Sequence, residues 1–307
     1  MPDLKPTAIR STMFRLAHIS DLHLSPMPKV LIRELISKRI TGYLNWHRHR
    51  KAFHQIGVLE CVMSEIKKKE INHLAITGDL VNLATTPEII AAKRWLENNC
   101  PVETTSLVPG NHDAYVPGAF NRAMKEWKPW VTGDVDIGAD VFPYMQMRGP
   151  VAIIGLSTSN ATMPFRATGK FSKKQADAAI NLLLEAKQRD LYRIILIHHP
   201  PYKGATHRMK RMYGMDHFSH MLDQAGADLI LHGHTHLNTR FDMASAHGKI
   251  PVIGISSATQ THGDKKPVAG FNLFEISKQG DEWQCEHARY LLNASLQHAE
   301  RVEQNKF

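Results

Sequence analysis

Apolar segments rich in β-branched residues recur along the chain and predict its strands. They lie at residues 13–20, 73–79, 104–110, 151–157, 192–198, 227–233, 251–257 and 271–277. These segments stay apolar at successive positions, instead of alternating with polar residues as half-exposed strands do. They are therefore typical of strands that are buried on both faces of a sheet.

Between many of these segments, the apolar positions follow a helical spacing. We expect helices over residues 50–70, 86–99 and 173–189. The last of them follows Ser172, which matches an S-x-x-Q capping box with Gln175. The alternation of strands and helices predicts parallel strands, and the short turns after residue 227 favour a mixed or antiparallel continuation. The predicted fold class is α/β.

The chain shows no internal repeat, low-complexity segment or change of composition that would mark a linker. We expect one domain over residues 12–292. A flexible N-terminal arm would precede it at 1–11, and a C-terminal tail would follow it at 293–307.

Five of the predicted strands end in polar clusters whose side chains can bind metal. The clusters are DLH (21–23), GD (78–79), GNHD (110–113), HHPP (198–201) and GHTH (233–236). Sites in α/β sheets form at the carboxyl ends of strands, so clusters that are distant in sequence can converge on one edge. The glycines within them permit sharp turns that bring backbone close to such a site.

The residue types in these clusters restrict the metal. They offer carboxylate and amide oxygens and imidazole nitrogens but no thiolate, which suits Mn, Fe, Zn or Co better than Cu(I) or an iron–sulfur cluster. There are more candidate ligands than one catalytic ion normally takes from a protein. Two ions about 3.5–4 Å apart, sharing a bridging carboxylate, would use them all; they could lower the pKa of a bridging water and neutralise charge on a phosphoryl group.

The five motifs, in this order, resemble those of the calcineurin-like metallophosphoesterase superfamily over roughly residues 14–292. The resemblance implies a four-layer sandwich of two mixed β-sheets flanked by helices. It implies one divalent ion held by Asp21, His23, Asp79 and His236, and a second held by Asp79, Asn111, His198 and His234. It also implies that His112 protonates the leaving oxygen or stabilises the transition state, and that Asp113 orients His112.

Four further polar residues lie in or beside the predicted strands. We expect His18, His199 and His232 to be packed or hydrogen-bonded within the fold. For Asn160, we expect a role in capping a loop.

The charge and cysteine content narrow the classes of partner and compartment. The formal net charge of +9 favours phosphate esters, nucleic acid or an anionic membrane surface as partners. A nucleic-acid role is not favoured, because no basic groove interleaved with aromatic residues is evident. The three cysteines form no C-x-x-C pair, which fits a reducing compartment. No segment reads as a signal peptide or as a membrane span of about 20 residues, so a cytoplasmic protein is expected.

The basic segment 29–51 has two interpretations. Ile32, Ile36 and Ile40 form an apolar helical stripe, and Gly42 is expected to break the helix. The segment is either a helix packed on the body with solvated basic side chains, or a cap that touches an anionic membrane or an amphiphilic substrate.

A second basic segment, 202–214, follows the HHPP motif. Its residues Lys203 and Arg208 are candidates for binding a substrate phosphate. A solvated loop is the alternative.

The sequence thus predicts a cytoplasmic, dinuclear, metal-dependent phosphohydrolase. The motifs ISDLHL, HHPP and LHGHTH are similar in style to those of bacterial class III cyclic-nucleotide phosphodiesterases, so a cyclic nucleotide or other small phosphodiester is the first expectation. The segment 29–51 keeps a second substrate open, a lipid-linked pyrophosphate as hydrolysed by the UDP-2,3-diacylglucosamine hydrolases of lipid A synthesis. A metal-free interaction scaffold is the non-enzymatic alternative, which the complete ligand set disfavours.

Overall fold

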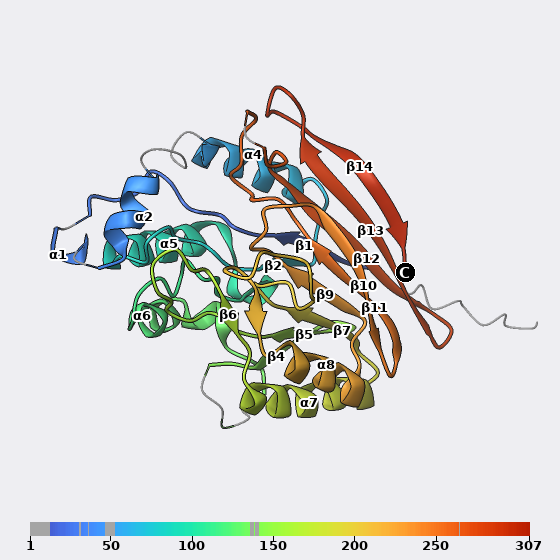
Figure 1. Ribbon diagram of the computed structural model, residues 1–307. Coiled ribbons are helices and arrows are strands. Elements are labelled where there is room, and N and C mark those ends of the chain that lie inside the picture. The colour runs from blue at the N-terminus through green and yellow to red at the C-terminus, as the bar shows by residue number, and fades with distance from the viewer. Residues whose placement is uncertain are drawn as a thin grey trace, which may run out of the picture.

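Two large mixed sheets form the centre of the structure (Figure 1). The computed structural model describes residues 13–30, 32–35, 37–46, 53–135, 138, 141–263 and 265–307. The arm predicted over residues 1–11 lies outside this part of the chain.

The first sheet has the strand order β14-β13-β12-β1-β2-β3. Its parallel strands are β1 (Phe14–Ile19), β2 (His73–Ile76) and β3 (Thr105–Leu107). Its antiparallel strands are β12 (Gly270–Gln279), β13 (Glu282–Leu292) and β14 (Ala299–Lys306). The strands that carry the first three polar clusters therefore run in the same direction and end at one edge.

The second sheet has the order β10-β11-β9-β7-β5-β4. Strands β5 (Val151–Gly155), β7 (Tyr192–Leu196), β9 (Leu229–His232) and β11 (Gly248–Gly254) are parallel. Strands β4 (Tyr144–Arg148) and β10 (Thr239–Ser245) pair antiparallel at the two edges. A separate short pair joins β6 (Gly169–Lys170) to β8 (Met212–Tyr213).

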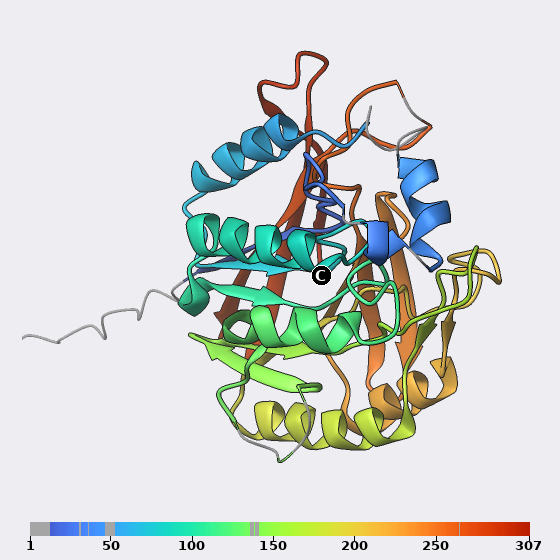
Figure 2. The ribbon, with the colours of Figure 1, turned by 90° about the vertical axis from the view of Figure 1, so that its left-hand side faces the viewer.

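The helices lie outside the two sheets. They are α1 (Ile32–Leu35), α2 (Arg39–Asn45), α4 (Ile56–Lys67), α5 (Thr86–Asn99), α6 (Ala119–Glu126), α7 (Lys173–Gln188) and α8 (Met215–Ala225), with 3₁₀ turns η2 (Val102–Thr104) and η3 (Lys128–Val131). Helices α7 and α8 lie on one side of the strands, and α4 and α5 on the other (Figures 1 and 2). The α/β four-layer sandwich expected from the sequence is confirmed.

The continuous apolar strands have the two-sided burial that their pattern predicts. In β5, Val151 and Ile153 belong to the core that includes the first sheet, whereas Ala152 and Ile154 belong to the core beneath α7 and α8. Successive side chains of a strand point to opposite faces, so a strand between two apolar layers must be apolar throughout.

Helix α7 begins where its capping signal predicts, but the predicted capping box is incomplete. Ser172 caps α7 by accepting a hydrogen bond from the Gln175 backbone N–H at 3.2 Å. The side chain of Gln175 does not complete the predicted box. It bonds the backbone of Ser157 instead, donating to its carbonyl and accepting from its N–H, both at 2.8 Å. This pair fixes the loop after β5 to the start of α7.

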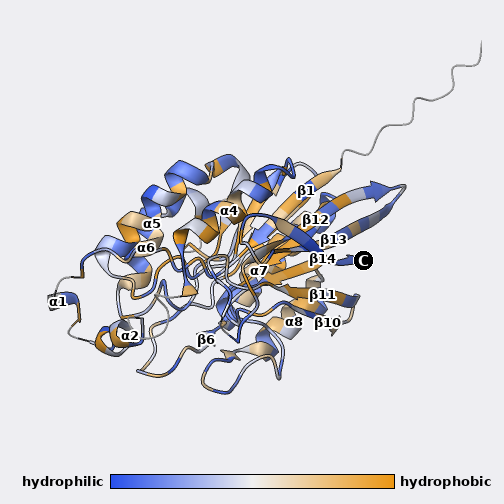
Figure 3. Cartoon of the chain, turned by 90° about the horizontal axis from the view of Figure 1, so that it is seen from above, coloured by the Kyte–Doolittle hydropathy of each residue, from blue (hydrophilic) through white to orange (hydrophobic). Residues whose placement is uncertain are grey.

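The C-terminal tail predicted over residues 293–307 is wrong, because residues 299–306 form strand β14 at the edge of the first sheet. This strand is largely hydrophilic in colour, unlike β1 (Figure 3). It is held partly by charge: Arg289 of β13 pairs with Glu303. Arg289 is 4% exposed and also donates to the carbonyls of Thr239 and Gly254 in the second sheet, at 3.3 Å each. Strand β13 therefore helps to join the two sheets through Arg289, the side chain that also pairs with β14.

The basic segment 29–51 is described only in part. It contains α1 and α2, and Gly42 lies inside α2, so the predicted helix break at this glycine is wrong. Arg39 anchors α2 to the body by donating to the carbonyls of Leu83 and Ala84. Residues 31, 36 and 47–51 lie outside the described residues. No helix in the described ranges is both long and apolar enough to cross a membrane.

Candidate functional site

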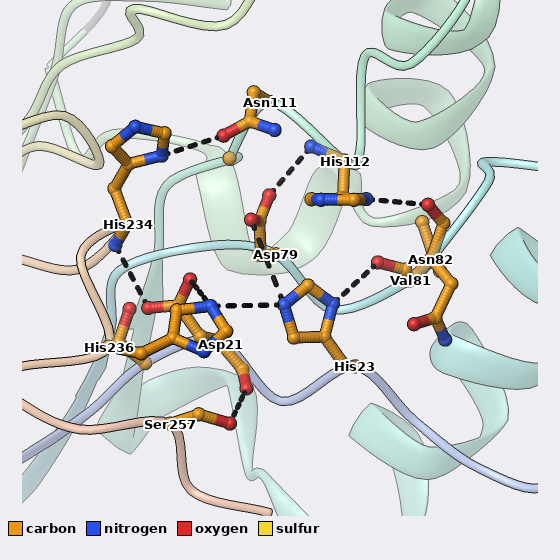
Figure 4. Close-up of polar contacts among 12 residues, drawn as sticks. Asp21, His23, Asp79, Val81, Asn82, Asn111, His112, His234, His236 and Ser257 are labelled. Atoms are coloured by element: carbon orange, nitrogen blue, oxygen red, sulfur yellow. Dashed lines mark hydrogen bonds and ion pairs between the residues drawn. The ribbon is translucent and has the colours of Figure 1, made fainter. Parts of the chain in front are cut away.

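The polar clusters after β1, β2 and β9 turn sharply away from their strands. Asp21, His23, Asp79, His234 and His236 all adopt left-handed backbone conformations, with φ of 53°, 40°, 56°, 68° and 53°. Non-glycine residues rarely adopt this conformation, and those that do are enriched at functional sites, where the surrounding structure holds them. The turns bring side chains from distant segments together at one sheet edge (Figure 4).

Asp21, His23 and His236 form one group of potential ligands. His236 Nε2 lies 3.1 Å from Asp21 Oδ1 and 3.4 Å from His23 Nε2. Ligands about 2.1 Å from a shared ion, at ordinary coordination angles, are themselves about 3.0–3.4 Å apart. The spacing of this group is therefore suitable for one ion.

Asn111, His198 and His234 form the second side of the site. Asn111 Oδ1 lies 2.8 Å from His234 Nδ1 and 3.3 Å from His198 Nε2. Asp79 lies between the two sides: its Oδ2 is 3.4 Å from His198 Nε2 and 4.0 Å from His23 Nε2. This position suits a carboxylate that bridges two ions.

Backbone carbonyls fix the proton positions of three of these histidines. His23 Nδ1 lies 3.2 Å from the Val81 carbonyl, His198 Nδ1 lies 2.6 Å from that of Thr77, and His234 Nε2 lies 2.9 Å from that of Lys210. A carbonyl oxygen can only accept, so each of these nitrogens donates its N–H. The other nitrogen of each ring then presents a lone pair to the site, as in histidines that bind metal.

This arrangement directs several lone pairs at one another. When the rings are neutral, the remaining nitrogens of His198 and His234 direct lone pairs at the carbonyl oxygen of Asn111, so a proton or a cation is needed between them. Asp21 Oδ1 is also buried and makes no hydrogen bond with acceptable geometry in the described residues. Buried acceptors that converge in this way need positive charge between them. The donor set therefore fits divalent cations.

The electrostatics of the buried carboxylates support the same conclusion. Burial alone would raise the pKa values of Asp21 and Asp79, but His236 beside Asp21 and His198 beside Asp79 outweigh burial and lower both. Burial would lower the pKa of His198, but Asp79 raises it to about 9. A proton is held where an ion would bind, so metal binding at this position would release it.

His112 lies at the edge of this cluster. Its Nδ1 donates to the carbonyl of Asn82 at 2.6 Å, and its backbone N–H donates to Asp79 Oδ1 at 2.7 Å (Figure 4). The ring stacks on Tyr115, with centroids 5.5 Å apart, and lies edge-on to His23 at 4.9 Å. Because Nδ1 is held by a carbonyl, Nε2 is the nitrogen that can act in the pocket.

The expectation that Asp113 orients His112 is wrong. The Asp113 carboxylate is fully buried and accepts backbone N–H groups from Asp79, Leu80, Val81 and Gly110, at 2.8–3.2 Å. The carbonyl of Asn82 takes the orienting role. Asp113 instead fixes the GD and GNHD loops against each other.

Gly110 and Gly233 are required because their backbone passes very close to other side chains of the site. A Cβ on Gly110 would overlap the Asp79 carboxylate, and one on Gly233 would overlap Ser20 Oγ and crowd Asp21 Oδ2. Only a residue without a side chain lets these loops approach the ligands so closely.

The remaining polar residues that the sequence singled out bond within the fold. His18 lies 2.8 Å from Thr77 Oγ1, His199 lies 2.7 Å from Thr158 Oγ1, and His232 lies 3.2 Å from Thr239 Oγ1. All three rings are fully buried, and burial is the main cause that lowers their pKa values.

A cavity of about 320 Å³ opens onto the cluster. It is lined by Phe53, His54, Asp79, Asn111, His112, Ala167, Lys210, His234, Thr235, His236, Gln260 and Lys266. Lys203 and Arg208 are exposed and do not line it, so their role in substrate binding stays a prediction. The cavity has Lys210 and Lys266 in their place. Lys210 lies in the predicted basic segment, but no motif indicated Lys266, His54 or Gln260.

The model of the calcineurin-like phosphoesterase family matches residues 14–238. Among solved structures, a dimetal phosphatase from Danio rerio superposes with a TM-score of 0.62 at 12% identity, covering 95% of this chain and 98% of that one. A purple acid phosphatase from yellow lupin gives 0.61 at 11% identity, covering 97% and 54%. A sulfate thiohydrolase from Thermus thermophilus gives 0.51 at 14%, covering 98% and 59%.

These structural likenesses, all at low identity, show a shared fold. No curated protein sequence matches the chain. The family model spans more than half of the chain and includes all seven candidate ligands and His112. The chain belongs to the calcineurin-like phosphoesterase family and is a metal-dependent phosphoric ester hydrolase.

Proposed function

We propose that the protein is a phosphodiesterase that acts on cyclic nucleotides or other small phosphodiesters. The observation that carries this proposal is the cavity of about 320 Å³, whose lining includes Asp79, His112 and two lysines. A volume of this order is at the small end for ligand pockets. It suits a compact ester held directly over the candidate ligands.

The proposed metal pair would be held by the seven residues that converge at the sheet edge. Asp21, His23, Asp79 and His236 would hold one ion, and Asp79, Asn111, His198 and His234 the other. A set of nitrogen and oxygen donors without sulfur supports Mn, Fe or Zn as the metal. When bound, such ions supply Lewis-acid stabilisation of the phosphoryl oxygens and activation of water.

The chain's own residues would perform the remaining steps. With Nδ1 held by the Asn82 carbonyl, the imidazolium of His112 can donate the Nε2 proton to the leaving oxygen. Tyr115 and His23 restrict the ring to this orientation.

Lys266 supports an anionic substrate in the same cavity. Its Nζ donates to the carbonyl of Thr235, between the two histidines of the GHTH motif, at 2.7 Å. This contact holds a positive charge beside the candidate ligands, where it favours a negatively charged ester.

The test is parallel turnover by Mn-loaded protein of bis-p-nitrophenyl phosphate, p-nitrophenyl phosphate, cyclic AMP and a UDP-lipid in detergent. We expect turnover of the diester and of cyclic AMP. Asp79→Asn and Asn111→Ala should lower bound Mn, measured by elemental analysis. Preference for the monoester, or an unchanged metal content in both variants, would contradict the proposal.

A lipid-linked pyrophosphate is the second candidate, favoured by one observation. Ile40 and Leu44 of α2 are half exposed, and Met163 and Phe165 are 69% and 86% exposed. Lys38 joins these two regions by donating to the Thr162 carbonyl at 3.0 Å.

Exposed apolar side chains beside basic ones can enter a membrane interface. This candidate would place the protein in the cytoplasm with peripheral contact at an anionic inner membrane. Strong preference for the UDP-lipid, with sedimentation on anionic but not neutral vesicles, would favour it over the small diester.

A further inference from the structure

Lys38, which directly precedes α2, makes contacts that link separate segments of the chain. Its Nζ donates to the backbone carbonyl and to the hydroxyl group of Thr162, at 3.0 Å each. The same ammonium group lies over the ring of Tyr115, 4.3 Å from the ring centroid. A cation at this distance is attracted by the negative face of an aromatic ring. Lys38 therefore connects the start of α2 and the loop after β5 with the residue that stacks on His112.

The segments on both sides of this contact are anchored. The Thr162 hydroxyl gives its hydrogen to the carbonyl of Arg166 at 2.6 Å, so it accepts from Lys38. The next residue, Arg39, is nearly buried and donates to two backbone carbonyls of the loop before α5. These bonds fix the backbone from which Lys38 extends and the place at which its ammonium group ends.

Helix α2 also passes directly beside the ring of Tyr115. A Cβ on Gly42 would overlap the Tyr115 hydroxyl, so the helix and the ring are in close contact. The ring in turn stacks on His112 with an angle of 16° between the two planes. The hydrogen bond from His112 Nδ1 to the Asn82 carbonyl fixes one atom of the imidazole, whereas a stacked neighbour fixes its plane.

The Lys38 side chain carries its charge under ordinary conditions. Burial lowers the pKa of Lys38 to about 8, so most molecules are still protonated at pH 7. The attraction between a cation and an aromatic face increases when the pair is partly shielded from water. The contact with Tyr115 is of this partly buried kind.

We propose that Lys38 is a positioning residue that holds His112, through the ring of Tyr115, in the orientation from which Nε2 protonates the leaving oxygen. The inference rests on the proposed diester hydrolysis. As the P–O bond breaks, its electron pair stays on the leaving oxygen, and the Nε2 proton passes to that oxygen. A tilted imidazole would transfer the proton less well, because the hydrogen bond to the oxygen depends on direction. Lys38 does not line the cavity, so its effect would reach the ester through the two rings.

The leaving group separates this role from a merely structural one. The p-nitrophenolate anion is stable and leaves without a proton, whereas the ribose oxygen of cyclic AMP is strongly basic and needs one. The values of kcat and KM would be measured at pH 7 on bis-p-nitrophenyl phosphate and on cyclic AMP. The proteins compared are the Mn-loaded wild type, Lys38→Met and Lys38→Arg.

We expect Lys38→Met to lower kcat for cyclic AMP by about 5-fold, the factor that corresponds to a cation–π contact of about 1 kcal/mol. KM for cyclic AMP and both constants for bis-p-nitrophenyl phosphate should change little. Lys38→Arg should keep most of the activity, because a guanidinium also binds an aromatic face and donates hydrogen bonds. In a His112→Ala background, Lys38→Met should have no further effect, because the group through which it acts is gone.

The matched control is Lys69→Met. Lys69 Nζ lies over the ring of Tyr290, 4.2 Å from the centroid, so the substitution removes the same kind of contact. Tyr290 stacks on Phe271, and none of these three residues lines the cavity. Lys69→Met should therefore behave as wild type on both substrates.

A second measurement needs no turnover. The NMR signal of the His112 Cε1–H group, identified by its loss in His112→Ala, depends on the ring current of the stacked Tyr115. This signal should move in Lys38→Met and keep its wild-type position in Lys69→Met.

Several results would overturn the inference. Equal losses of kcat on both substrates would show that Lys38 supports the fold or the metal site instead of His112. An unchanged kcat for cyclic AMP in Lys38→Met, an equal loss in Lys69→Met, or an unmoved His112 signal would each contradict the proposed role. If the wild type hydrolyses no diester, the proposed function fails, whereas the NMR signal still tests whether Lys38 holds the His112 ring.

Discussion

Acid destabilisation through His73 follows directly from the structure. His73 in β2 is fully buried, and its Nε2 lies 2.7 Å from Ser106 Oγ. Ser106 gives its hydrogen to Gln146, so Nε2 must be the donor to Ser106. His73 Nδ1 is buried without a hydrogen-bond partner in the described residues. A second proton would place an unpaired charge there, and burial, together with Arg148, lowers the pKa of His73 to about 3.

The sign and size of the effect follow from linkage. The pKa of His73 is lower in the folded state than its ordinary value of 6.5, so the unfolded state binds the extra proton between these two values. Stability is therefore complete above pH 6.5 and is lost as pH falls toward 3. Between pH 7 and pH 5, His73 alone should lower the free energy of unfolding by about 2 kcal/mol.

The assay is urea unfolding of wild type and His73→Gln at pH 7 and pH 5. Glutamine retains a donor to Ser106 but cannot be protonated, so the variant should lose about 2 kcal/mol less stability than wild type on acidification. Contributions from the other histidines cancel in this difference. The exposed His220→Gln is the control and should keep the wild-type pH dependence. Equal pH dependence in His73→Gln and wild type would refute the reasoning.

Three further predictions concern the site and the sheets. His112→Ala should lower kcat by about 10²–10⁴-fold while bound Mn is unchanged; loss of metal would instead make His112 a ligand together with His23 and Asp79, whose ligand atoms lie close enough to share an ion with it. Gly110→Ala should weaken Mn binding in calorimetry because its Cβ would displace the Asp79 carboxylate, whereas Gly57→Ala, where a Cβ meets no atom within 4 Å, should bind Mn normally. Glu303→Gln should lower the free energy of unfolding by about 3 kcal/mol, because it leaves the buried Arg289 without its ion-pair partner; a loss below 0.5 kcal/mol, on the order of a surface pair, would contradict that role.

The sequence predicted the parts of the fold that depend on local pattern. Strands buried on both faces are recognisable because they are apolar throughout, and their carboxyl ends meet at one edge whatever lies between them. The convergence of Asp21, Asp79 and His198 could therefore be anticipated without coordinates.

The parts that were missed depend on contacts between distant segments. Strand β14 is an edge strand rich in charged residues, and an ion pair with β13 helps to hold it, so its pattern resembles that of a solvated tail. Asp113 follows a motif histidine in sequence, yet its carboxylate binds backbone N–H groups, which no side-chain pattern reveals. His54, which lines the cavity, pairs with residue 260, more than 200 positions away.

The left-handed backbone at five of the candidate ligands has a consequence for the evolution of this site. At about 1 kcal/mol for each such residue, the five together cost about 5 kcal/mol, comparable with the whole stability of a small domain. Glycine at any of them would relax the chain and destroy a ligand. A stabilising substitution at any of these positions would therefore remove a candidate ligand, so thermal robustness and metal binding compete at this site.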